Sequence, residues 1–134
     1  MIYLDSAAVM KLVRLETGDP CLGLAECAPR RALVSSTLVE VEVPHALRRA
    51  APQALVGVPS ALARLYRLEI DATVRATAAT FAEPTLRTLD AVHLATAQLL
   101  VAEAGAAFEA FVSHDKRLLA AASAVGLPTE CPGA

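Results

Sequence analysis

Residues 1–13, MIYLDSAAVMKLV, contain the pattern on which the fold depends. The apolar run 1–4 is closed by Asp5, and apolar residues then recur at the spacing of a helix. This pattern predicts a buried strand that delivers Asp5 at its carboxyl end, directly before a helix. The same order of apolar run, polar residues and helical pattern returns at 110–125, where the run ends in Ser113, His114 and Asp115.

Strand and helix patterns alternate along the rest of the chain. Hydroxyl residues at 35–37 offer N-caps for a helix that runs toward Arg49, in which Pro44 predicts a kink or a locally irregular turn near 40–43. Further strands are predicted at 32–34, 68–70, 110–112 and 127–129, and further helices at 21–27, 59–67, 72–81, 89–103 (capped by Thr88 and ended by Gly105) and 116–125. Such alternation predicts an α/β fold of three layers, with a mainly parallel sheet of four to five strands flanked by helices.

Length and composition indicate a single domain over residues 1–134. The chain is 55% hydrophobic, which is enough to build a core, and it contains no repeat or linker-like segment. Its formal net charge of −2 excludes strong nucleic-acid binding through overall charge, so any contact with RNA has to be local. The basic pairs that could supply it, or could simply be solvated helix ends, are Arg30 with Arg31, Arg48 with Arg49, and Lys116 with Arg117.

The remaining composition points to the cytoplasm. Three cysteines, Cys21, Cys27 and Cys131, are an odd number without CxxC spacing, which favours plain thiols over disulfides or a zinc site. The N-terminus lacks the basic start of a signal peptide. The apolar stretch 91–102 is shorter than the roughly 20 residues that a membrane-spanning helix needs, so we expect no membrane association.

Three acidic residues are predicted to meet at one edge of the sheet. Asp5 and Asp115 follow strands, and ligands of parallel α/β sheets bind beyond the carboxyl ends of the strands. Asp90 lies in the first turn of its helix and can face the same edge. Each has an ordinary structural alternative, because Asp5 and Asp115 could cap the helices that follow them and Asp90 could serve the helix dipole.

A fourth acid comes from the helix that follows residues 35–37. Glu40 and Glu42 both border its apolar stripe, so helical geometry does not choose between them. Thr37 and Glu40 have the spacing of a capping box, which gives Glu40 a structural role and leaves Glu42 as the better candidate. Four clustered carboxylates repel one another unless a cation lies among them or some of them stay protonated, and oxygen ligands favour Mg²⁺ or Mn²⁺. We therefore expect a divalent-metal site that activates water for attack on a phosphodiester.

Four segments, in the same order, resemble the PIN-domain family, and specifically the VapC-type toxins of toxin–antitoxin pairs. They are MIYLDSAAVMKL (1–12), SSTLVEVEVPHALRR (35–49), LDAVHLATA (89–97) and FVSHDKRLLAAASAVGLP (111–128), and together they cover nearly the whole chain. Alignment on ALRR places the family's glutamate at Glu42. Ala7, where many relatives carry Ser or Asn, and Pro44 depart from the family pattern.

The resemblance implies a toxin endoribonuclease that depends on Mg²⁺ or Mn²⁺, with RNA as substrate, a VapB-type antitoxin as partner, and a homodimer. It assigns Asp5, Glu42, Asp90 and Asp115 to catalysis and metal binding. Ser6 and Ser113 would orient a carboxylate or a bound water, or make ordinary turn and cap hydrogen bonds. His93 shares a helix face with Asp90, so it either contacts the site or is a buried histidine with satisfied hydrogen bonds.

Two other functions stay open at this stage. A PIN-like module could hold RNA or a protein partner without cleaving it, although such a module has no reason to keep a costly carboxylate cluster. A phosphatase of the haloacid-dehalogenase type is disfavoured because Ala7, and not an acid, lies two residues after Asp5. The histidines lack HExxH spacing, which argues against a zinc hydrolase.

Overall fold

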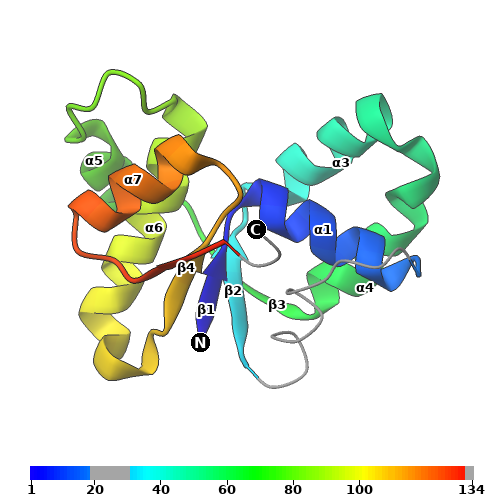
Figure 1. Ribbon diagram of the computed structural model, residues 1–134, viewed down its shortest axis with the longest axis horizontal. Helices are drawn as coiled ribbons and strands as arrows, with labels where there is room; N and C mark the ends of the chain where they lie inside the picture. Colours follow the sequence, from blue (N-terminus) through cyan, green and yellow to red (C-terminus); the bar gives the residue numbers. More distant parts are fainter. Residues whose placement is uncertain (19–30, 132–134) are drawn as a thin grey trace.

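The computed structural model describes residues 1–18 and 31–131 (Figure 1). Its strands form one parallel sheet in the order β3-β2-β1-β4-β5. The strands are β1 (Ile2–Leu4), β2 (Leu33–Ser36), β3 (Leu65–Leu68), β4 (Ala110–Val112) and β5 (Thr129–Glu130). From β1 the sheet grows through β2 and β3 on one side and through β4 and β5 on the other. The winding direction therefore reverses between β1 and β4, which is where such sheets bind ligands.

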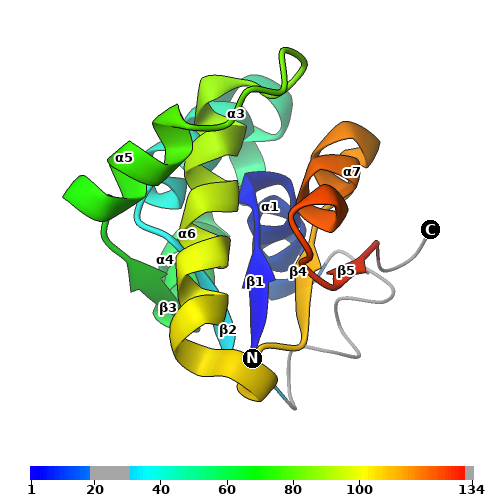
Figure 2. The same ribbon diagram turned by 90° about the vertical axis from the view of Figure 1, so that its left-hand side faces the viewer.

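Helices cover both faces of the sheet, which confirms the predicted three-layer α/β class (Figure 1). One layer contains α1 (Ser6–Glu16), α3 (Val39–Ala50) and α4 (Val58–Ala63), and the other contains α5 (Ala72–Ala79), α6 (Thr88–Ala104) and α7 (Lys116–Ala124). Figure 2 shows α6 in front of β2 and α7 beside β4 and β5, with β1 visible between the two helices. Short 3₁₀ turns at Pro52–Gly57 and Gly105–Ala107 follow α3 and α6.

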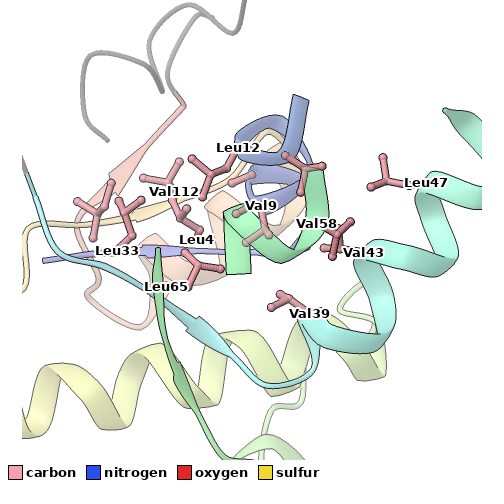
Figure 3. Close-up of a cluster of buried hydrophobic side chains, with 14 of the residues drawn as sticks. Leu4, Val9, Leu12, Leu33, Val39, Val43, Leu47, Val58, Leu65 and Val112 are labelled. Atoms are coloured by element: carbon pink, nitrogen blue, oxygen red, sulfur yellow. The ribbon is translucent and has the colours of Figure 1, made fainter. Parts of the chain in front are cut away.

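Two apolar clusters lie on opposite faces of the sheet, and β1 contributes to both. Ile2 and Leu4 belong to the cluster under α1, α3 and α4, which Figure 3 shows in close-up. Tyr3 points the other way, into the cluster under α6 and α7. This alternation is what a strand buried on both faces requires, because successive side chains leave it on opposite sides. All three residues are fully buried.

Two predicted strands lie elsewhere than expected. The third strand is Leu65–Leu68 and not 68–70, and the helix predicted at 59–67 ends at Ala63. Leu65 is buried and pairs in register with Leu33, so core packing decides the position of this strand. The edge strand is Thr129–Glu130 instead of 127–129, because Leu127 is buried in the second cluster.

The predicted helix caps need correction as well. No capping box forms, because α3 begins at Val39 and the Glu40 amide donates to the backbone oxygen of Thr37, at 3.0 Å. The irregular turn expected at 40–43 lies instead at the beginning of α3, where backbone hydrogen bonds join residues three positions apart. The helix continues through Pro44 to Ala50. Thr88 is the first residue of α6 rather than its cap.

Some predictions fall outside the described residues, namely the helix at 21–27 with Cys21 and Cys27, and Arg30. Cys131 is a free, half-buried thiol, as predicted. Gly105 ends α6 with a φ of 55°, a backbone conformation that glycine adopts at little cost. Among the described residues, no helix combines the length and the apolar character needed to span a membrane.

Candidate active site

A cavity of about 310 Å³ lies at the carboxyl edge of the sheet, beside the point where the winding reverses. All four acids singled out in the sequence line it, although they come from α3, from α6 and from the loops after β1 and β4. The complete lining is Asp5, Ser6, Ala7, Glu42, Arg87, Thr88, Leu89, Asp90 and Asp115.

Asp5 is the most firmly held of these acids. It is 4% exposed and caps α1, with Oδ1 accepting a hydrogen bond from the Ala8 amide at 2.9 Å. Its Oδ2 accepts one from the buried hydroxyl of Ser113 at 2.5 Å. Burial raises the pKa of Asp5, and the two hydrogen bonds oppose that rise. The capping role that was the alternative for Asp5 is therefore real, and it leaves the carboxylate in the cavity wall.

Asp115 is joined to Asp5 through the same serine. The Asp115 amide donates to the Ser113 hydroxyl at 3.0 Å, so one oxygen links the loops after β1 and β4. Asp115 also caps α7, with Oδ1 accepting from the amides of Arg117 at 2.9 Å and Leu118 at 3.4 Å. Ser113 thus orients one carboxylate and the backbone of another.

Asp90 lies in the first turn of α6, as predicted, and is half-buried. Burial raises its pKa, and the carboxylate of Asp115 raises it further, whereas His93 and Arg87 lower it. The repulsion between Asp90 and Asp115 shows that negative charge accumulates in the cavity.

Glu42 and His93 connect the two helix layers above the sheet. Glu42 comes from α3 and His93 from α6, and His93 Nε2 lies 2.7 Å from Glu42 Oε1. On the far side of the ring, Nδ1 lies 2.8 Å from the Tyr3 hydroxyl. The Glu42 side chain is 16% exposed and that of His93 is 1% exposed. Glu40, the alternative to Glu42, points elsewhere and is within 3.6 Å of Arg67.

Ser6 lines the cavity as the first residue of α1. The sequence reasoning did not single out Arg87 and Leu89, which also line it and are exposed. Their position beside Asp90, at the start of a strongly predicted helix, was the signal that could have identified them. Of the basic pairs, Arg31 lies away from the cavity and within 4 Å of Glu109 and Glu130.

The donor chemistry of the cavity suits a hard divalent cation, since four carboxylates supply only oxygen. In residues 1–18 and 31–131, however, no three acids, histidines or cysteines stand close enough together to hold an ion in this arrangement. Binding a cation would therefore require the less firmly held carboxylates to turn toward it.

A parallel α/β domain with acids from four elements at its carboxyl edge matches one family directly. The sequence model of the PIN domain aligns with residues 2–124, which is nearly the whole chain. The protein therefore belongs to the PIN-domain family.

Its relatives within that family carry the name VapC. Ribonuclease VapC35 of Mycobacterium tuberculosis is 45% identical over 134 residues, covering 99% of this chain and 98% of the relative. Ribonuclease VapC46 of the same species is 37% identical, covering 98% of this chain and 97% of that protein. The fold also matches a chain in the crystal structure of VapBC2 from Rickettsia felis bound to a promoter DNA fragment. That match has a TM-score of 0.65 and 15% identity, and it covers 97% of this chain and 98% of the other.

Proposed function

We propose that this protein is a metal-dependent endoribonuclease and the toxin of a VapBC-type toxin–antitoxin pair. The observation that carries the proposal is the cavity of about 310 Å³, into whose wall the fold brings Asp5, Glu42, Asp90 and Asp115. The full-length relatives named as ribonucleases support the same activity, and RNA as the substrate.

The four carboxylates would hold Mg²⁺ or Mn²⁺. When bound, the cation would lower the pKa of water and neutralise charge that develops on the phosphate. Several carboxylate oxygens remain for this purpose, because no residue in the described part of the chain donates to Glu42 Oε2, to Asp115 Oδ2 or to either oxygen of Asp90. Asp5 accepts one hydrogen bond on each oxygen and keeps a lone pair on each, so it is the ligand whose position the fold fixes before a cation binds.

Other residues of the chain would position the RNA. Arg87 places a permanent positive charge at the cavity, beside the acids, where it can pair with a phosphate next to the cleaved bond. Leu89 is 46% exposed and offers an apolar surface for a base or ribose. The ionised carboxylate of Glu42 can accept a proton on Oε2 while Oε1 stays bonded to His93.

Cleavage of labelled RNA with Mg²⁺, Mn²⁺ or EDTA tests this function. We expect cleavage only with metal, and a loss of at least about 100-fold in D5N, E42Q and D90N, because even indirect partners of metal ligands are worth 10–100-fold. E40Q is the matched control on the same helix, and it should cleave like the wild type. Equal cleavage by wild type and D90N, or undiminished cleavage in EDTA, would contradict the proposal.

The toxin assignment makes two further statements about assembly. The protein would form a homodimer and would bind a VapB-type antitoxin that covers the cavity. Light scattering of the purified chain should give twice the monomer mass of 14.0 kDa. Co-expression with the product of the adjacent reading frame should yield a complex in which RNA cleavage is suppressed. A monomer would argue against the homodimer, and a complex that still cleaves RNA would argue against an antitoxin that covers the cavity.

A further inference from the structure

The contact between His93 and Glu42 extends into the core as a buried chain of polar groups. Tyr3 is fully buried in the second apolar cluster, and its ring stacks on Phe111 with centroids 5.4 Å apart and planes 8° apart. The ring of His93 meets that of Tyr3 edge-on, at 5.8 Å and 72°. Aromatic packing therefore fixes the Tyr3 hydroxyl 2.8 Å from Nδ1 of His93.

The protons available to Tyr3, His93 and Glu42 determine which group donates in each of the two hydrogen bonds that join them. Burial raises the pKa of Tyr3, so its hydroxyl keeps its proton and can donate. The neighbouring hydroxyls of Ser35 and Thr96 already donate to the backbone oxygens of Leu4 and Val92, both at 2.7 Å. Those two hydroxyls therefore do not donate to Tyr3, whose hydroxyl lies 2.8 Å from Nδ1 of His93. A neutral imidazole that carries its proton on Nε2 offers Nδ1 as the acceptor for the Tyr3 proton, so the direction of this bond is set by the bond at Nε2.

The proton on Nε2 points at the site. An ionised Glu42 has only acceptor atoms, so the 2.7 Å contact is Nε2–H donating to Oε1. In both hydrogen bonds, from Tyr3 to His93 and from His93 to Glu42, a donor then faces an acceptor. A buried histidine of the opposite tautomer would face the carboxylate with a bare nitrogen, which costs free energy.

We propose that His93 is a positioning residue, locked by the Tyr3 hydroxyl as the Nε2–H tautomer, which holds one oxygen of Glu42 and aims the other at the cavity. This deepens the proposed nuclease function and rests on it. The arrangement also gives α3 a polar tie to α6 across the edge of the sheet. Without it, the Glu42 carboxylate would lose its hydrogen-bond partner, on a helix whose buried apolar side chains belong to the cluster on the other side of the sheet from α6.

Amide substitutions of His93 separate positioning from packing. Nε2 of glutamine, like Nε2 of histidine, lies four bonds from Cα, whereas the nitrogen of asparagine lies three bonds away and corresponds to Nδ1. H93Q should therefore keep the donor to Glu42, and H93N should lose it. We expect H93N to lower kcat by about 10–100-fold with KM changed less than about threefold, and H93Q to recover most of that loss. Equal rates in H93N and H93Q, at whatever level, would overturn the positioning role.

Nuclear magnetic resonance tests the tautomer without any cleavage assay. In the metal-free full-length protein at pH 8, the ¹⁵N shifts of His93 should identify Nε2 as protonated and Nδ1 as the acceptor. Y3F should change these shifts, while Y66F, which makes the same change at the 69% exposed second tyrosine, should leave them unchanged. A Nδ1–H tautomer, or shifts insensitive to Y3F, would overturn the proposal even if the nuclease function holds. Absent cleavage with the expected shifts would instead contradict only the function.

Discussion

The acids around the cavity differ in how many hydrogen bonds the protein gives them. Asp5 accepts one hydrogen bond on each oxygen, Asp115 accepts two on a single oxygen, Glu42 accepts one, and Asp90 receives none from the described residues. A carboxylate that is fixed by the fold keeps its place whether or not a cation is present. A carboxylate without hydrogen-bond partners is held in place only when a cation is bound. In the metal-free protein, its repulsion with the neighbouring negative charges lowers the stability of the fold.

Asp90 should accordingly weaken the metal-free protein. Because its folded-state pKa lies above the usual value of 3.8, the folded state binds the proton more readily than the unfolded state. Stability then falls as pH rises through the interval between the two values, and at neutral pH the ionised group is a net cost. We expect D90N to melt roughly a few degrees above the wild type in EDTA at pH 7. The difference should disappear below about pH 3.8, and a lower melting temperature of D90N at pH 7 would contradict this reasoning.

Arg87 should act on substrate binding rather than on the chemical step. Replacing it with glutamine removes one phosphate contact, so KM should rise several-fold while kcat stays near the wild-type value. The dependence of RNA affinity on salt should lose about one unit of slope, because one fewer phosphate is neutralised. R75Q, at an exposed position of α5 that does not line the cavity, is the control and should change neither quantity. An unchanged salt slope in R87Q would rule out the contact.

At the scale of elements, two helices begin at residues of the site. Asp5 caps α1 directly after β1, and Asp115 caps α7 three residues after the end of β4. The short reach of a capping side chain ties its oxygen to the first turn, and the strand fixes where that turn begins. The positions of these acids are thus set by backbone structure, which explains how loops of one and three residues can build part of a precise site.

The cap of α7 can be separated from the chemistry of Asp115. D115A should lower the free energy of unfolding by about 1 kcal/mol, because the amides of Arg117 and Leu118 lose their acceptor. D115N keeps an acceptor oxygen and should lose much less stability. Both variants should lose RNA cleavage. Urea denaturation in EDTA measures the first effect, and equal stability of D115A and D115N would show that the cap contributes little.

Local patterns in the sequence predicted the elements that local patterns determine. The strand before Asp5, the helix of Asp90 and its end at Gly105 were all foreseen, because hydrophobic period and glycine act within a few residues. The strand at Leu65 was displaced in the prediction because its place depends on pairing with Leu33, more than thirty residues away. The position of a short strand such as Thr129–Glu130 is difficult to predict for the same reason.

The choice of Glu42 over Glu40 shows a further limit. The capping box that favoured it does not form, and Glu42 lines the cavity because α3 turns that face toward α6. Family alignment reached the same residue without this argument. The partner of His93 could not be predicted either, since Tyr3 counts as an apolar strand residue until the register of the sheet places it beneath α6.

At the scale of the whole molecule, the sheet separates two apolar clusters, and acids from both helix layers and from the loops after two central strands meet at one edge. A cation bound there would contact elements that are distant in sequence, so it would stabilise only the folded state. The site would then couple metal binding to the stability of the entire domain.

Mg²⁺ should therefore raise the melting temperature of the wild type. At a concentration of about 100 times Kd, the linkage amounts to roughly 2.7 kcal/mol. D90N should lose most of this gain although its fold is intact, and E40Q should retain it. Differential scanning calorimetry in Mg²⁺ and in EDTA measures both. The same increase in wild type and D90N would place the cation outside the cavity.

The caps on α1 and α7 also determine which acid should be substituted to obtain a catalytically inactive variant that still folds. A host cell that overproduces an active ribonuclease digests its own transcripts, so production calls for an inactive chain that keeps its shape. The substitution D5A would remove both the side-chain cap of α1 and the acceptor of the Ser113 hydrogen bond. Asp90 carries no such ties in the described residues, which makes it the position where activity can be switched off at the lowest cost to the scaffold.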